Sequence, residues 1–220
     1  MALENAPVGA PRWRIVAALV AVGALLAFSG YVFWLQDWKY GLPTPRPADL
    51  TQAPIGSAVA LPPALAGLRA QAAGRPLFLH FFNPDCPCSR FTQDHISALV
   101  HAHHDAVMFA AIVESDDDGG AVDAAAVAKT GRALGISALG DSSGAIGRAL
   151  GVYATPQAVI LRADGTIFYR GNYNTSRYCA DAQTEFARLS LEHLLAGRPF
   201  AAPEAASVAY GCALPEGHRQ

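Results

Sequence analysis

The sequence predicts an α/β domain with at least some parallel strand pairing, placed behind a single N-terminal transmembrane helix. From residue 76 to residue 196, apolar strand-like runs alternate with helix-like segments, which is the pattern of βαβ units. Residues 15–35 carry no charged side chain and are long enough to cross a hydrocarbon core of about 30 Å as a helix. A further signal, Asp164-Gly165, predicts a tight hairpin between the last two strands.

Each element of the domain follows from the spacing of apolar residues and from the Gly, Pro and Asp residues that separate them. In chain order, the expected elements are a short helix at 64–73, a strand at 76–82, a helix at about 89–104, a strand at 107–113, a helix at about 121–134, a short strand near 135–138, a helix at about 143–150, strands at 157–162 and 166–170, and a helix at about 180–196.

The charges beside the apolar stretch predict its orientation. Arg12 and Arg14 precede it, whereas Asp37 and Lys39 follow and cancel, so the N-terminus is expected in the cytoplasm and the C-terminal domain outside, in the periplasm. A cleaved signal peptide is the alternative, but an interfacial aromatic belt favours an uncleaved anchor in the inner membrane. The belt consists of Tyr31, Phe33, Trp34, Trp38 and Tyr40.

The chain thus divides into five expected parts. They are a cytoplasmic N-terminus (1–14), a transmembrane anchor (15–36), a proline-rich linker (37–63) that holds the domain off the bilayer, the α/β domain (64–198) and a C-terminal tail (199–220). A net charge of −2 gives no basic footprint, so a nucleic acid is not expected as a partner.

Two cysteines follow the first strand closely and are the candidate catalytic residues. Cys86 and Cys88, with only Pro87 between them, stand where the strand ends and a helix begins. Pro87 suits the first helical position, so Cys86 is expected at the cap and Cys88 in the first turn. A helix N-terminus favours a thiolate over a thiol. We therefore expect Cys86 to be an exposed nucleophile and Cys88 its resolving partner.

Two segments resemble the thioredoxin-like superfamily. One is residues 76–91, with the Asn-Pro-Asp-Cys-Pro-Cys motif; the other is Gly151-Val152-Tyr153-Ala154-Thr155-Pro156, which leads into 157–161 and Asp164-Gly165-Thr166-Ile167. The likeness spans about 75–196 and is closest to membrane-anchored redoxins of the bacterial envelope. It implies a central mixed sheet flanked by helices. It also implies a cis bond at Pro156, with the backbone of Thr155 binding an extended substrate.

The resemblance has one clear departure, because thioredoxins separate their cysteines by two residues and this chain by one. If Cys86 aligns with the family's first cysteine, His80 takes the place of the buried acid that handles the resolving thiol's proton. In the other register Cys88 is the second cysteine and Asp85 replaces the first. We prefer the first register, and with it His80 is a candidate general acid/base; a satisfied core histidine is the alternative.

The other two cysteines, Cys179 and Cys212, flank the last predicted helix. In an exported domain we expect them to form a structural disulfide that fixes the tail. A second redox pair that passes electrons to Cys86 and Cys88 is the alternative.

Together these observations predict a membrane-anchored thiol–disulfide oxidoreductase that acts on protein disulfides outside the membrane and needs no cofactor. Its partners would be client thiols or disulfides and a protein that recycles the cysteine pair. A copper chaperone that uses the same cysteines with a histidine is the alternative function, and a scaffold that only docks partners is a third.

Overall fold

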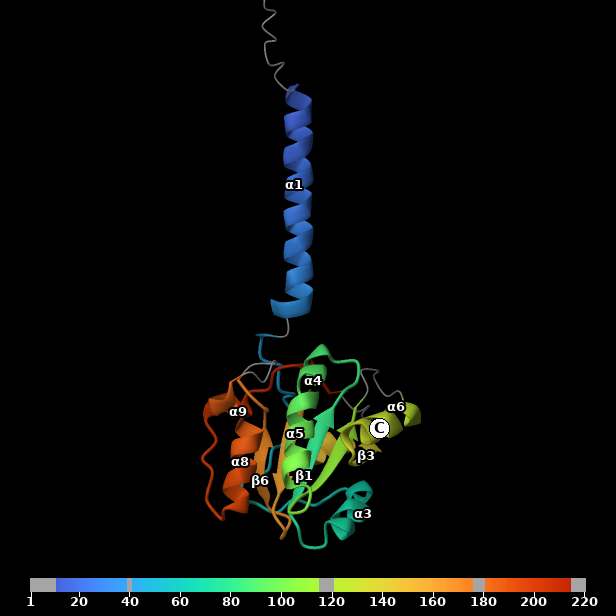
Figure 1. The fold of residues 1–220 in the computed structure, drawn as a ribbon, viewed down its shortest axis with the longest axis vertical. Coiled ribbons are helices and arrows are strands. Elements are labelled where there is room, and N and C mark those ends of the chain that lie inside the picture. The colour runs from blue at the N-terminus through green and yellow to red at the C-terminus, as the bar shows by residue number, and fades with distance from the viewer. Residues whose placement is uncertain (1–10, 39–40, 115–120, 176–180, 215–220) are drawn as a thin grey trace, which may run out of the picture. The chain divides into compact units, whose positions relative to one another are not determined.

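The computed structural model describes residues 11–38, 41–114, 121–175 and 181–214, which fall into two compact units, one up to residue 39 and one from residue 40 onward. The first unit is helix α1 (Arg12–Phe33), continued by a π-helical turn η1 (Trp34–Trp38) (Figure 1). Residues Arg12–Gln36 contain an 18-residue window with a mean hydropathy of 2.3, and they are long and apolar enough to cross a membrane. The helix expected at 15–36 therefore forms, and its length and composition suit a single membrane span.

The second unit is built on a five-stranded mixed sheet in the order β3-β2-β1-β5-β6. The central strand β1 pairs in parallel with β2 and antiparallel with β5; β2 and β3 are parallel, and β5 and β6 antiparallel. This arrangement, with helices on both faces, is the thioredoxin-like fold that the sequence predicts. The strands are β1 (Leu77–Phe82), β2 (Met108–Val113), β3 (Ser137–Gly140), β5 (Gln157–Leu161) and β6 (Ile167–Gly171).

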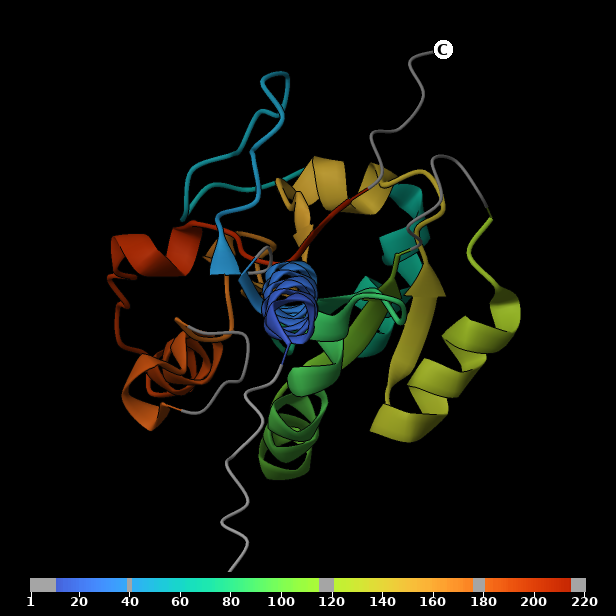
Figure 2. The same cartoon turned by 90° about the horizontal axis from the view of Figure 1, so that it is seen from above.

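Two hydrophobic clusters hold the helices on the sheet, because consecutive residues of a strand point to opposite faces. Phe78 belongs to one cluster and Leu77 and Leu79 to the other. The first cluster packs under α5 (Gln93–His103), α8 (Phe186–Leu195) and the end of α6 (Ala124–Leu134); the second packs under α3 (Pro63–Ala72) and α7 (Ala145–Leu150). Figure 2 shows these helices on opposite sides of the sheet.

The helix expected at 89–104 is divided into α4 (Pro87–Phe91) and α5, which meet at Thr92. The Thr92 hydroxyl donates to the carbonyl oxygen of Ser89 at 2.8 Å, and such local bonds compete with the helical ladder. The helix expected at 180–196 likewise begins as a 3₁₀ turn, η2 (Ala182–Thr184), before α8.

The proline-rich segment does not behave as a separate spacer, so that prediction is wrong for residues 41–62. Its Gly56 amide donates to Ile167 at the edge strand β6, and the Ile167 amide donates to Ser57. Gln52 donates to Gly151 at 2.6 Å. These hydrogen bonds attach the segment to the domain, and Ala53, Val59 and Leu61 add apolar contacts with the second hydrophobic cluster.

The tail also packs on the domain and contains two elements that the sequence did not reveal. They are α9 (Glu204–Ser207) and β7 (Cys212–Ala213), which pairs with the two-residue strand β4 (Ala154–Thr155). The Asn172 side chain donates to the carbonyl oxygens of Ala205 and Val208. The described part of the tail is therefore a continuation of the fold.

Candidate active site

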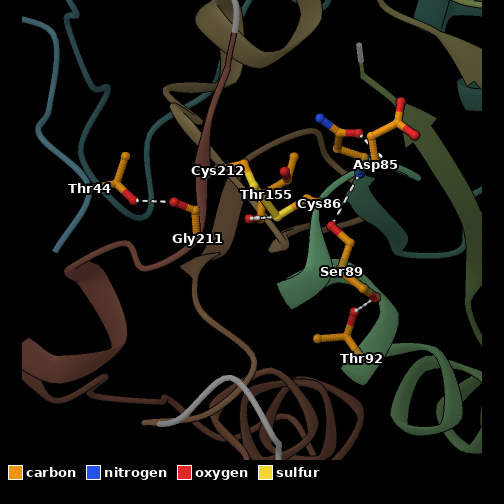
Figure 3. The surroundings of a disulfide bond; sticks show 9 residues. Thr44, Asp85, Cys86, Ser89, Thr92, Thr155, Gly211 and Cys212 are labelled. Atoms are coloured by element: carbon orange, nitrogen blue, oxygen red, sulfur yellow. Dashed lines mark hydrogen bonds between the residues drawn. A yellow bond between two sulfur atoms is a disulfide. The ribbon is translucent and has the colours of Figure 1, made fainter. Parts of the chain in front are cut away.

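The cysteine motif lies where β1 ends and α4 begins. As predicted, Cys86 is the N-cap residue, Pro87 is the first helical residue and Cys88 lies in the first turn. The turn before them is held by Asn83, whose carbonyl oxygen accepts from the Cys86 amide at 3.2 Å and whose side-chain oxygen accepts from the Asp85 amide at 2.8 Å. The position of the Cys86 backbone is thus fixed by hydrogen bonds within its own loop (Figure 3).

The disulfide of the structure joins Cys86 to Cys212, across 126 residues and with 6.0 Å between the two Cα atoms. The predicted bond between Cys179 and Cys212 is therefore wrong, because Cys212 already has a partner. Cys179 lies outside the described residues. The physical reason is the pairing of β7 with β4, which brings Cys212 to the N-terminus of α4 rather than toward the last helix.

The second piece of the site is the Thr155-Pro156 turn. Its peptide bond is cis, as the resemblance implies. Cys86 Sγ lies 3.6 Å from the Thr155 carbonyl oxygen, so the cysteine faces the turn (Figure 3). The Thr155 backbone, which the resemblance assigns to an extended substrate, is paired here with Cys212 in an antiparallel register.

Both motif cysteines are buried, with exposed fractions of 0% for Cys86 and 1% for Cys88. The expectation that Cys86 is exposed is wrong for this disulfide-bonded state. The chain's own tail lies against this site, since Cys212 is bonded to Cys86 and paired with Thr155, and Ala213 is paired with Ala154. A client can therefore reach the Cys86 sulfur only when β7 separates from β4.

His80 lies in the middle of β1 and is fully buried. Its Nδ1 is 2.7 Å from the Tyr173 hydroxyl, and Nε2 has no hydrogen-bond partner among the described residues. Burial, with a smaller contribution from the nearby His95, lowers the pKa of His80 to about 3, because a charged imidazole is costly away from water. The imidazole is therefore neutral at physiological pH.

Two buried carboxyls that the sequence analysis does not single out follow the carboxyl ends of β2 and β3, at the same end of the sheet as Cys86. Glu114 directly follows β2 and Asp141 directly follows β3, and the Glu114 amide donates to Phe82 at the end of β1. Burial and the neighbouring Asp141 raise the pKa of Glu114 to about 9, so Glu114 is protonated at neutral pH. Glu114 directly follows the strand predicted at 107–113, and this position was the signal that could have revealed it; Asp141 stands three residues beyond the strand predicted near 135–138.

Among the residues that the structure describes, no group of three or more His, Cys, Asp or Glu side chains is arranged to hold a metal ion. The Nδ1 atom of His95, a histidine on α5, lies 3.6 Å from the Glu185 carboxylate. No structural observation within these ranges favours the copper chaperone.

The comparisons with known proteins are consistent with this fold. Residues 58–214 match the model of a domain of unknown function (DUF6436). A hypothetical protein of Sinorhizobium meliloti is 18% identical, with 77% of this chain and 98% of that chain covered and a TM-score of 0.57. An uncharacterised conserved protein of Geobacillus kaustophilus is 23% identical, with 79% and 97% covered and a TM-score of 0.55. None of the curated proteins compared with the chain matches it.

A secreted disulfide oxidoreductase of Mycobacterium tuberculosis, described as homologous to E. coli DsbE, is 29% identical over 44% of this chain and 69% of that chain, with a TM-score of 0.37. Because the first two structures align over most of both chains, they show that the whole domain has a fold found in solved proteins.

Proposed function

We propose a function for this chain, which belongs to the DUF6436 family of domains of unknown function: it is a membrane-anchored thiol–disulfide oxidoreductase that acts on protein disulfides on the outer, periplasmic side of the inner membrane. The observation that carries the proposal is the position of Cys86. Cys86 is the N-cap of α4, it faces Thr155, and its sulfur is bonded to Cys212 of β7, the strand that pairs with Thr155. A sulfur with this placement is suited to exchange disulfides with an extended peptide.

In the proposed reaction the reduced Cys86 thiolate attacks one sulfur of a client disulfide. A bond forms between Cys86 and the client, and the client's other sulfur leaves as a thiolate and takes up a proton. Cys88 then attacks Cys86, so that a Cys86–Cys88 disulfide forms and the client leaves as a dithiol. Two electrons pass from the cysteine pair to the client; in reverse, the same steps oxidise a client.

The Thr155-Pro156 turn would bind the client by backbone pairing, as it now binds β7. His80 is the proposed proton acceptor for the Cys88 thiol. With a pKa of about 3, its neutral imidazole would hold that proton only transiently. A separate redox protein outside the membrane would return the cysteine pair to its starting state.

The membrane part of the proposal is supported by α1 and its flanking charges. The span Arg12–Gln36 has the length of a transmembrane helix, and Arg12 and Arg14 stand at its start, the side that positive charges keep in the cytoplasm. An anchor raises the concentration of the domain near other membrane proteins, so anchored clients are the favoured substrates.

The test is to trap the intermediate between Cys86 and a client. The double variant Cys88→Ser/Cys212→Ser keeps Cys86 but lacks both neighbouring thiols that could release a bound client. When the reduced full chain is mixed with a peptide disulfide, we expect a stable adduct on Cys86, measured by intact mass and peptide mapping. The matched control also carries Cys86→Ser and should form no adduct at this site. A folded double variant whose Cys86 stays unmodified would refute the proposed function.

A further inference from the structure

The strand β7 pairs with β4 and is joined to Cys86 by a disulfide, at the position where the proposed function requires a client. We infer that Cys212 is a third redox-active cysteine, and that residues 208–214, here called the strap, are an internal client that exchanges its disulfide with Cys86 and Cys88. This inference rests on the proposed function and adds to it a defined partner sulfur within the chain.

The strap pairs with β4, the strand to which the proposed function assigns the client, as a bound peptide strand would. Thr155 is opposite Cys212 and Ala154 opposite Ala213, in antiparallel pairing. The Leu214 amide then donates to the Tyr153 carbonyl oxygen at 3.0 Å. Since strand addition at an exposed edge is a common way to bind an extended peptide, the strap has the backbone contacts that a client would make.

Gly211 shows how closely the strap fits this edge. Its φ is +131°, in a region that favours glycine, and a Cβ at this position would overlap the carbonyl oxygen of Thr155. Two residues after Cys212, the Leu214 side chain reaches over Gly147 at the start of α7. Gly211, before Cys212, and Leu214, after it, therefore both pack closely against the domain.

The outer side of the strap is held by the segment that precedes the domain. The Thr44 amide donates to the Ala209 carbonyl oxygen at 2.8 Å, and the Thr44 hydroxyl donates to the Gly211 carbonyl oxygen at 3.0 Å (Figure 3). Pro43 also forms an isolated antiparallel bridge with Tyr210. These contacts keep the strap beside the site, so that a strap released from Cys86 stays within reach of it.

The exchange itself needs no added oxidant or reductant. The Cys88 thiolate attacks Cys86 Sγ, the bond between Cys86 and Cys212 breaks, and Cys212 leaves as a thiolate that takes up the proton lost by Cys88. The number of disulfides is unchanged. The closed form, with Cys86 joined to Cys212, is thereby converted to an open form with Cys86 joined to Cys88, and the Thr155 edge becomes available to a client.

The inference is tested by mapping disulfides in the oxidised full chain in detergent, in a Cys179→Ser background that leaves only three cysteines. We expect both the Cys86–Cys212 and the Cys86–Cys88 bonds, in proportions that re-equilibrate after either is isolated. Gly211→Ala should shift the ratio toward Cys86–Cys88 by roughly tenfold, because the added Cβ overlaps Thr155. The matched control is Gly67→Ala, at an exposed position with nothing near its Cβ.

Two outcomes would overturn the inference. One is a Cys86–Cys212 bond that is the sole species and persists in folded protein under millimolar dithiothreitol, as a permanent structural bond would. The other is a ratio of Cys86–Cys88 to Cys86–Cys212 bonds that is the same in Gly211→Ala as in the parent. Turnover by Cys212→Ser separates this inference from the proposed function. Suppose that Cys212→Ser reduces a peptide disulfide, while the Cys179→Ser protein, which keeps Cys212, shows no exchange between the two disulfides. The strap inference then fails and the proposed function stands.

Discussion

Acidification from pH 6.5 to pH 3 is expected to lower the free energy of unfolding by about 4 kcal/mol through His80 alone. The unfolded chain takes up a proton on this imidazole near pH 6.5, whereas the buried ring, with its pKa of about 3, does not. The unfolded state therefore binds more protons throughout this window. The contribution of His80 is fully present above pH 6.5 and is lost as the pH falls toward 3.

The substitution that tests this is His80→Asn, which keeps a polar atom near the Tyr173 hydroxyl but cannot be charged. We expect its unfolding free energy to fall less steeply than that of the parent between pH 6.5 and pH 3, measured by denaturant titration of the full chain in detergent. His101→Asn, at an exposed position on α5, is the matched control and should keep the parent slope. Parallel curves for the parent and His80→Asn would contradict the assignment.

Glu114→Gln is expected to stabilise the protein by about 3 kcal/mol at pH 7. Unfolded glutamate ionises near pH 4.5, while the buried carboxyl stays protonated up to about pH 9. The contribution of Glu114 is therefore fully present below pH 4.5 and is lost as the pH rises through 9. Glutamine fills the same space without this proton uptake, so the gain should grow from pH 5 to pH 8.

The same denaturant titration measures this gain. Glu204→Gln, at the exposed start of α9, provides the matched control and should change stability little at any pH. A gain at Glu114 that is the same at pH 5 and pH 8 would show that the carboxyl is not held protonated.

The sequence predicts the fold well because its signals are local. The apolar run at 77–82 and the Asp164-Gly165 turn each appear in the structure near the expected residues. The positions of Cys86, Pro87 and Cys88 at the start of α4 follow from helix capping alone. Conversely, α9 and β7 carry little apolar periodicity, and they are held by residues distant in sequence, Asn172 for α9 and β4 for β7.

The candidate site is harder to predict for the same reason. The bond between Cys86 and Cys212 depends on β7 pairing with β4, two residues against two, and such a short strand leaves no recognisable pattern in a sequence. The burial of Cys86 follows from that pairing. Glu114, in contrast, was within reach of sequence reasoning, because it directly follows the strand predicted at 107–113. Asp141 was not, because the strand predicted near 135–138 ends three residues before it, whereas the observed β3 extends to Gly140.

The hydrogen bonds of Thr44 determine where a soluble fragment should begin. The region that matches the family starts at residue 58, and a fragment cut there would lose Thr44 and the three backbone and side-chain contacts that Pro43 and Thr44 make with residues 209–211. Leu50, which is buried beside Tyr153, would be lost as well. For expression and crystallisation, the first residue should therefore lie at or before Gly41.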